Sequence, residues 1–280
     1  MSTPAALAER ALLLEVAATP TPGNVDRERD LPDLHFDQFL AGAAGARPGF
    51  AAIAEGDAIA NGFELAVAGM ADAAGTNTQF GSVLLLAPLL RATTQDDDLT
   101  PATANRAVDA TTVEDAAAFY RSFDHVDVRV DDPPADLEPL DVRRGSEAVQ
   151  TIRDRGLTLA AIMEAAAEHD GIAAEWGCGF ERTFTAADRL ATDQEPIGER
   201  APRVHLELLA DEPDTLVATK HDLDTAVEVS ERAASIDPDD ATAVRAFADE
   251  LVEAEINPGT TADILAGGLF VALVREEVNS

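Results

Sequence analysis

Lysine is almost absent from this 280-residue chain. Lys220 is the only one, and lysine and arginine together number 20 against 53 aspartate and glutamate residues. The net charge of −33 excludes the basic face on which nucleic-acid binding depends, so we expect no nucleic-acid partner. The acids are spread through the chain, and the longest run is Asp96–Asp98, a pattern typical of adaptation to a salt-rich cytoplasm rather than of an acidic tail.

The chain also has little cysteine, few aromatic residues and no long apolar run. The single cysteine, Cys178, excludes an intramolecular disulfide bond and a cysteine zinc cluster. Aromatic residues make up 5% of a sequence that is 46% hydrophobic and rich in alanine, which is typical of closely packed helices rather than of sheets. The apolar run Leu84–Leu90 is too short to span a bilayer, and no basic, apolar leader is evident, so we expect a cytoplasmic protein that does not bind membranes.

Helical spacing of apolar residues and frequent capping residues predict an all-α fold, with one compact domain over residues 1–280. Strands and helices do not alternate along the chain, which argues against a parallel sheet. The predicted helices cover residues 4–18, 37–45, 49–74, 81–92, 100–110, 112–122, 158–170, 171–190, 222–235, 239–254 and 261–278.

Three polar segments each precede or interrupt the apolar helices. They read TPTPGNVDR (19–27), GTNTQFGS (75–82) and NPGTTAD (257–263), and each combines bends, small hydroxyls and an Asn or Asp. Junctions of this kind present free backbone N–H groups at helix N-termini, which suits an anion such as a triphosphate. One such segment alone would be an ordinary turn with a helix cap, but three of them indicate a site.

These segments resemble the triphosphoribosyl-dephospho-CoA synthase family, which serves citrate lyase and malonate decarboxylase in bacteria. The resemblance rests on Glu15 followed by TPTPGNVDR, on GTNTQFGSVLLLAPL and on NPGTTAD, with LHFDQF (34–39) and DTLVATKH (214–221) between them, and it spans roughly residues 10 to 275. The chain departs from the family pattern at Thr21, where members often carry a lysine that can contact phosphate. It also has Gly259-Thr260-Thr261 where many bacterial members have Gly-Gly-Ser.

The resemblance implies an all-α transferase that joins ribose C1′ of ATP to the 2′-hydroxyl of 3′-dephospho-CoA and expels adenine. Such a glycosyl transfer requires neutralisation of the triphosphate, stabilisation of an oxocarbenium-like carbon, a base for the hydroxyl and a proton for adenine. Mg²⁺ bound by carboxylates is the expected cofactor. ATP and dephospho-CoA, or a related acceptor, are the expected partners, and a homodimer is left open.

Three acids and one histidine are the candidates for this chemistry. Glu15 in the last turn of the first helix, Asp26 in a loop opened by Gly23, and Asp263 in the first turn of the last helix are candidate metal ligands. Glu15 and Asp26 are also candidate catalytic groups, and His221 is a candidate acid for the leaving adenine because its pKa lies near neutrality. The alternative is that these are solvated or capping side chains.

The candidate substrate contacts are small, polar or basic. Lys220 is singled out as a triphosphate contact because an otherwise lysine-free chain retains it next to His221; the alternative is a structural ion pair. Asn77 and Thr78 either bind phosphate or ribose or simply cap the helix that follows. The remaining candidate binding residues are Gly23, Asn24, Arg27, Gly75, Gly81, Gly259, Thr260 and Thr261. We expect these separate segments to converge on one site.

Two other functions fit the same residues. One is a Mg²⁺-dependent, all-helical hydrolase of N-glycosidic or phosphate bonds, in which water replaces the acceptor. The other is a non-catalytic nucleotide-binding protein, which the loss of lysine at Thr21 favours.

Overall fold

The computed structural model describes residues 2–95, 98–128, 138–192 and 195–278. Within these residues the chain forms helices and no β-strand, and its β-type backbone pairing is limited to two isolated bridges, Asp26–Arg29 and Leu31–Leu34. The prediction of an all-α fold is therefore confirmed. None of the described helices combines the length and the apolar character needed to span a bilayer.

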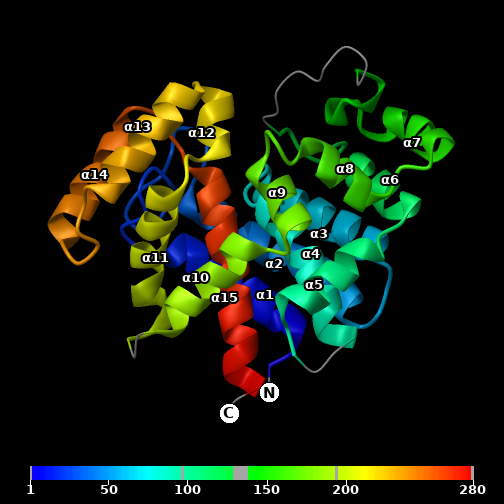
Figure 1. The fold of residues 1–280 in the computed structure, drawn as a ribbon, viewed down its shortest axis with the longest axis horizontal. Helices are drawn as coiled ribbons and strands as arrows, with labels where there is room; N and C mark the ends of the chain where they lie inside the picture. The colour runs from blue at the N-terminus through cyan, green and yellow to red at the C-terminus, as the bar shows by residue number, and fades with distance from the viewer. Residues whose placement is uncertain (1, 96–97, 129–137, 193–194, 279–280) are drawn as a thin grey trace.

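The helices are joined by connections of different lengths, and residues 18–35 form a long connection between the first two helices (Figure 1). In chain order they are α1 (Pro4–Ala17), α2 (Phe36–Ala54), α3 (Ile59–Ala74), α4 (Phe80–Gln95), α5 (Pro101–Asp109), α6 (Val113–Ser122), the 3₁₀ helices η1 (Glu138–Leu140) and η2 (Val142–Ala148), α7 (Val149–Arg155), α8 (Leu159–Ala166), α9 (Gly171–Cys178), α10 (Glu181–Ala191), α11 (Ile197–Asp211), α12 (Thr215–Lys220), α13 (Leu223–Ala234), α14 (Ala241–Glu253) and α15 (Gly259–Val278).

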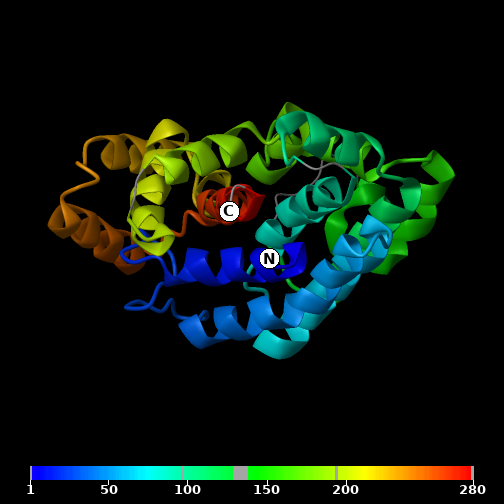
Figure 2. The ribbon, with the colours of Figure 1, turned by 90° about the horizontal axis from the view of Figure 1, so that it is seen from below.

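The last helix, α15, runs through the middle of the molecule and lies beside α1 in both views (Figures 1 and 2). Its residues Ile264, Leu265 and Phe270 are fully buried, because α1, α4, α10 and α11 surround it. Gly268 lets α10 approach closely, since a Cβ there would lie 2.5 Å from the Cβ of Ala186. The N-terminal turn of α15 is thus held in the interior by packing on several sides.

Two apolar clusters form the core. The larger one collects side chains from α1 to α11 and from α15, whereas the smaller one joins α11 to α13 and α14 through residues such as Leu209 and Phe247. Helix α11 contributes Leu208 to the first cluster and Leu209 to the second. The pair α13 and α14 forms one edge of the molecule and α6 and α7 the opposite edge (Figures 1 and 2).

The boundary between α2 and α3 differs from the sequence prediction. Helix α2 continues through Pro48 and ends before Gly56, whereas the prediction broke the chain at 46–48 and ran a second helix from Gly49 to Ala74. Pro48 is exposed, so the Ala44 carbonyl that it leaves without a helical partner can bond to water. Gly56 has φ +103°, a conformation that ends the helix.

The predicted helix 171–190 is in fact two helices, α9 and α10. Gly179 and Phe180, which lie between the two helices, both have positive φ, 80° and 61°, and so interrupt the helical conformation. The buried Glu175 then accepts hydrogen bonds from the N–H groups of Arg182 and Thr183, at 3.0 and 2.8 Å, and caps α10. Helices α7, α11 and α12 were not among those predicted: α7 and α12 have only 7 and 6 residues, and charged residues interrupt the apolar spacing of α11.

Candidate active site

The first turns of α4 and α15 meet at Asp263. Ser82 Oγ donates a hydrogen bond of 2.5 Å to Asp263 Oδ1. Gly81 lies directly against the same carboxylate, because a Cβ at this position would collide with Asp263 Oδ2. The second and third polar segments, far apart in the sequence, are therefore in direct contact, as predicted.

Glu15 reaches the same region from the last turn of α1. Its side chain is buried, and Gln79 Nε2 donates to its Oε2 over 3.2 Å and to the Leu12 carbonyl over 3.2 Å. Burial raises the pKa of Glu15 to about 8, the negative charge of Asp263 adds to this rise, and the hydrogen bond from Gln79 opposes it. Gln79 Oε1 is buried and has no hydrogen-bond partner in the described part of the chain.

Asp263 is only partly exposed, and its pKa is also raised. Burial raises its pKa to about 7, the hydrogen bonds from Ser82 oppose this, and the charges of Asp214 and Asp170 add to it. Two carboxyl groups that titrate near neutrality thus lie close enough to influence each other, an arrangement found more often at functional sites than elsewhere.

Two further helix starts are attached to the first turn of α15. Asp214, which is fully buried, accepts hydrogen bonds of 2.7 Å from both Thr261 N and Thr261 Oγ1, and also caps its own helix α12. Thr215 Oγ1 lies 3.0 Å from Thr260 Oγ1 and accepts a hydrogen bond from Gly171 N, the first residue of α9. The N-termini of α4, α9, α12 and α15 are therefore gathered around the acids.

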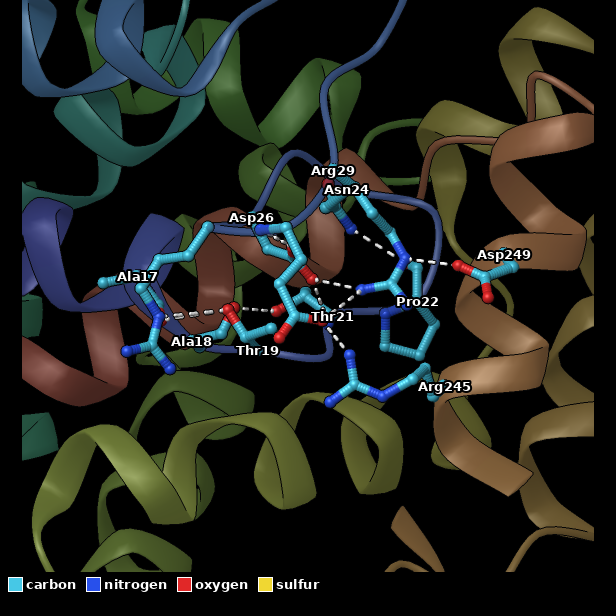
Figure 3. Close-up of polar contacts among 12 residues, drawn as sticks. Ala17, Ala18, Thr19, Thr21, Pro22, Asn24, Asp26, Arg29, Arg245 and Asp249 are labelled. Atoms are coloured by element: carbon cyan, nitrogen blue, oxygen red, sulfur yellow. Dashed lines mark hydrogen bonds and ion pairs between the residues drawn. The ribbon is translucent and has the colours of Figure 1, made fainter. Parts of the chain in front are cut away.

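Asp26 lies in the first loop, residues 18–35 between α1 and α2, where several hydrogen-bond donors hold its carboxylate (Figure 3). Its carboxylate accepts from Thr21 N at 3.0 Å, Glu28 N at 2.7 Å and Arg29 Nη1 at 3.0 Å. Arg29 lies between Asp26 and Asp249 of α14, and its Nε is 2.7 Å from Asp249 Oδ1. Burial raises the pKa of Asp26, and the hydrogen bonds from Thr21 and Arg29 oppose that rise.

The first loop is also fastened to the turn before α15. Gly23, with φ +71°, has no room for a side chain, since a Cβ would collide with the Ile256 carbonyl. Asn257 Nδ2 donates to Gly23 O and to Asn24 Oδ1, both over 3.1 Å. The side-chain amide of Asn24 is thereby engaged within the protein, and Gly259 packs under Leu216 of α12.

Several of the predicted substrate-binding residues lie away from the junction of α1, α4 and α15. Arg27 is exposed and donates to Thr19 Oγ1. Lys220 and His221 are exposed at the far end of α12, which at 1.5 Å per residue is about 9 Å from its start, and His221 Nε2 lies 3.3 Å from the Glu255 carbonyl.

The residues between α3 and α4 lie near the junction but differ in how they are engaged. Asn77 accepts from Phe80 N and so caps α4, while its Nδ2 donates to the Asp127 carbonyl over 3.3 Å. Thr78 Oγ1 is buried without a hydrogen-bond partner among the described residues. Gly75 ends α3 with φ +73° and has open space around it.

The residues that the sequence analysis missed are those that connect the segments. Ser82 and Gln79 belong to the second polar segment, and Asp214 to the DTLVATKH segment, so their place in those motifs was the available signal. Arg29 had no signal beyond its position near Asp26. Within the described ranges, no group of three or more His, Cys, Asp or Glu side chains is arranged to hold a metal ion, and Asp26 has its own partners apart from Glu15 and Asp263.

Comparison with known proteins identifies the family of the chain. The model of the ATP:dephospho-CoA triphosphoribosyl transferase family (CitG) matches residues 1–280. The chain belongs to this triphosphoribosyl transferase family. An inferred triphosphoribosyl-dephospho-CoA synthase from Archaeoglobus fulgidus has a similar crystal structure, with a TM-score of 0.67 and 26% identity, over 84% of this chain and 98% of that one. A search of curated proteins finds no match. The predicted family and transferase activity are thus confirmed.

Proposed function

We propose that the chain transfers the 5-triphosphoribosyl group of ATP to the 2′-hydroxyl of 3′-dephospho-CoA at the junction of α1, α4 and α15. The bond between ribose C1′ and adenine breaks, and a bond from C1′ to the acceptor oxygen forms. One proton must leave the acceptor hydroxyl and one must reach adenine. Because ATP is made inside the cell, we also propose a cytoplasmic location.

Glu15 is proposed as the group that protonates the departing adenine and then deprotonates the acceptor hydroxyl. A carboxyl group with a pKa of about 8 is mostly protonated at neutral pH, so it can give its proton to the departing adenine. The carboxylate that remains can then take the proton of the acceptor hydroxyl, which returns Glu15 to its starting state. The unpartnered Gln79 Oε1 supports this role, because a protonated Glu15 can donate a hydrogen bond to it.

Asp263 is proposed to keep Glu15 protonated and to face the substrate. Its negative charge raises the pKa of Glu15, and it retains some solvent exposure whereas Glu15 is buried. Its position in the first turn of α15, bonded to Ser82 of α4, puts it at helix N-termini, whose dipoles favour phosphate oxygens. Lys220 and Arg27 are the cations proposed to approach the triphosphate from the surface.

The residues present fit Mg²⁺ entering with ATP. One or two carboxylates are sufficient where substrate phosphates complete the coordination shell, and Asp263 offers one, whereas the protonated Glu15 is not counted as a ligand. When bound, the ion would neutralise charge on the triphosphate. Asp26, whose carboxylate already accepts three hydrogen bonds, is proposed to hold the first loop in shape rather than to exchange a proton.

The observation that carries the proposal is the joint placement of Glu15, Gln79, Ser82 and Asp263. The test is adenine release from ATP with and without dephospho-CoA, measured in molar KCl for the wild type and for Glu15→Gln. General acid–base catalysis typically contributes 10²–10⁴-fold, so we expect acceptor-dependent release that falls by roughly that factor in the variant. Glu9→Gln is the matched control, because Glu9 lies on the same helix but pairs with Arg47 instead.

The other outcomes identify the alternatives. Release that does not need the acceptor would mean a hydrolase, and ATP binding without release would mean a nucleotide-binding protein. Full activity of Glu15→Gln would contradict the role given to Glu15 while leaving the transferase reaction in place.

A further inference from the structure

One fully buried titratable side chain takes no part in the proposed chemistry. His205 lies in α11 with no exposed surface, and its Nε2 is 3.2 Å from Nδ2 of Asn24 in the first loop. Its Nδ1 is also buried and has no hydrogen-bond partner in the described residues. Burial lowers the pKa of His205 to about 3, so the ring is neutral at physiological pH. Sequence analysis gave no reason to single it out.

The contacts of Asn24 decide which ring nitrogen carries the proton. Besides His205, Asn24 Nδ2 faces the carbonyl oxygens of Pro22 at 3.1 Å and Pro258 at 3.3 Å. A carbonyl oxygen can only accept, so the amide must turn its nitrogen toward all three neighbours, which share its two hydrogens. His205 Nε2 must therefore accept, and the proton of the neutral ring must lie on Nδ1.

This arrangement connects three parts of the protein. His205 belongs to α11, Asn24 to the loop that carries Asp26, and Pro258 to the turn that leads into α15. On its other side the Asn24 amide oxygen accepts from Asn257 Nδ2 at 3.1 Å. A shift of the Asn24 amide would therefore displace both the first loop and the start of the helix that presents Asp263.

A buried N–H without an acceptor destabilises a protein, so the ring is poorly suited to a purely structural place. A buried donor left without an acceptor is expected mainly where function requires it. We propose that His205 is a positioning residue: held neutral with its proton on Nδ1, it accepts from Asn24 and fixes the first loop against the start of α15. The inference rests on the proposed function only in taking that junction as the active site.

The activity test compares two replacements of similar length. The side chain of His205→Gln can place its amide oxygen where Nε2 accepts, whereas His205→Met fills the space without a comparable acceptor. We expect kcat/KM of His205→Met to fall about tenfold or more, as for loss of one buried hydrogen bond, and His205→Gln to stay within about threefold of wild type. His125→Met, a change at an exposed histidine, is the control. Equal losses in both His205 variants would overturn the proposal.

A second measurement does not depend on activity or on the variants folding well. Long-range ¹H–¹⁵N spectra of the wild-type protein distinguish the two neutral tautomers of an imidazole, and His205→Gln identifies which of the five histidines gives the signal. We expect a neutral ring protonated on Nδ1 from pH 8 down to pH 5. A proton on Nε2, or a charged ring at pH 5, would overturn the proposal. Glu15→Gln with full activity would instead contradict the proposed chemistry and leave this result untouched.

Discussion

Ser82 and Asp263, 181 residues apart in the chain, are joined by a hydrogen bond of 2.5 Å. The bond links the first turn of α4 to the first turn of α15, and Gly81 allows the carboxylate to lie against the α4 backbone. Through Asp263 the same site reaches Glu15, whose pKa is raised in part by its charge. This short contact therefore joins the starts of two helices, and the charge of Asp263 adds to the effect of burial on the pKa of Glu15.

The first prediction concerns the pH dependence of the reaction. If protonated Glu15 is the acid, turnover falls as the pH rises through about 8, the pKa of Glu15. In Asp263→Asn the charge that helps to raise this pKa is gone, so the alkaline limb of the pH–turnover profile should move to lower pH. Asp188→Asn, which removes a surface carboxylate paired with Arg275, should leave the limb in place. An unchanged limb in Asp263→Asn would mean that another group titrates.

The second prediction concerns stability and pH. The pKa of Glu15 is raised on folding from 4.5 to about 8, so the folded protein holds this proton more strongly than the unfolded chain does. Protonated Glu15 therefore contributes its full stabilisation of the folded state below about pH 4.5, and this contribution is lost as the pH rises through about 8. Relative to wild type, Glu15→Gln should therefore gain a few kcal/mol in unfolding free energy between pH 5 and pH 9, since glutamine does not titrate.

Chemical denaturation of both proteins at several pH values measures this difference. A difference that stays constant with pH would show that Glu15 titrates at the same pH in the folded and unfolded chains. Glu9→Gln, which changes a partly exposed carboxylate of α1 paired with Arg47, serves again as the control.

The third prediction concerns Asp214, which caps its own helix and also holds the start of α15. Asparagine keeps one acceptor oxygen but turns an N–H toward Thr261 N, which now donates to Asp214 Oδ2 over 2.7 Å. We expect Asp214→Asn to lower the unfolding free energy by about 2–3 kcal/mol and to reduce turnover.

Asp240→Asn is the matched control for this change. Asp240 also caps a helix, accepting from Thr242 N and Ala243 N at 3.1 Å each, but its carboxylate is exposed and belongs to the start of α14. We expect a loss of about 1 kcal/mol or less there and no change in turnover. Equal effects of the two variants would mean that the bond from Asp214 to Thr261 contributes nothing beyond an ordinary cap.

The fourth prediction concerns salt. A net charge of −33 favours expansion of the chain by self-repulsion, and raising the salt from about 0.1 M to 1 M shortens the Debye length from about 10 Å to about 3 Å. We expect the unfolding temperature to rise strongly between low and multimolar KCl. Sucrose at matched osmolality stabilises by exclusion without screening charge, so it should have a smaller effect. Equal effects of salt and sucrose would contradict a screening mechanism.

The helical class and the identity of the three polar segments could be predicted from the sequence. Alanine-rich, aromatic-poor composition and caps such as Thr112 and Asp222 are local signals, because a cap and its helix lie within a few residues of each other. The breaks at Gly56 and at Gly179–Phe180 were not predictable in the same way. There, packing and the capping of α10 by Glu175 override the pattern of the surrounding residues.

Within the site, the sequence by itself determined which residue types were available, and it correctly indicated that the segments of Glu15, Gly81 and Asp263 belong together. Only the tertiary structure decided their roles. Burial and a neighbouring charge raise the pKa of Glu15, whereas Arg29 and backbone donors occupy Asp26, and no spacing along the chain distinguishes these two acids. His205 shows the same limit, because its partner Asn24 is 181 residues away in the sequence and the direction of their hydrogen bond depends on the carbonyl groups of Pro22 and Pro258. Electrostatic environment and hydrogen-bond direction arise from contacts between distant segments, and such contacts exist only in the folded chain.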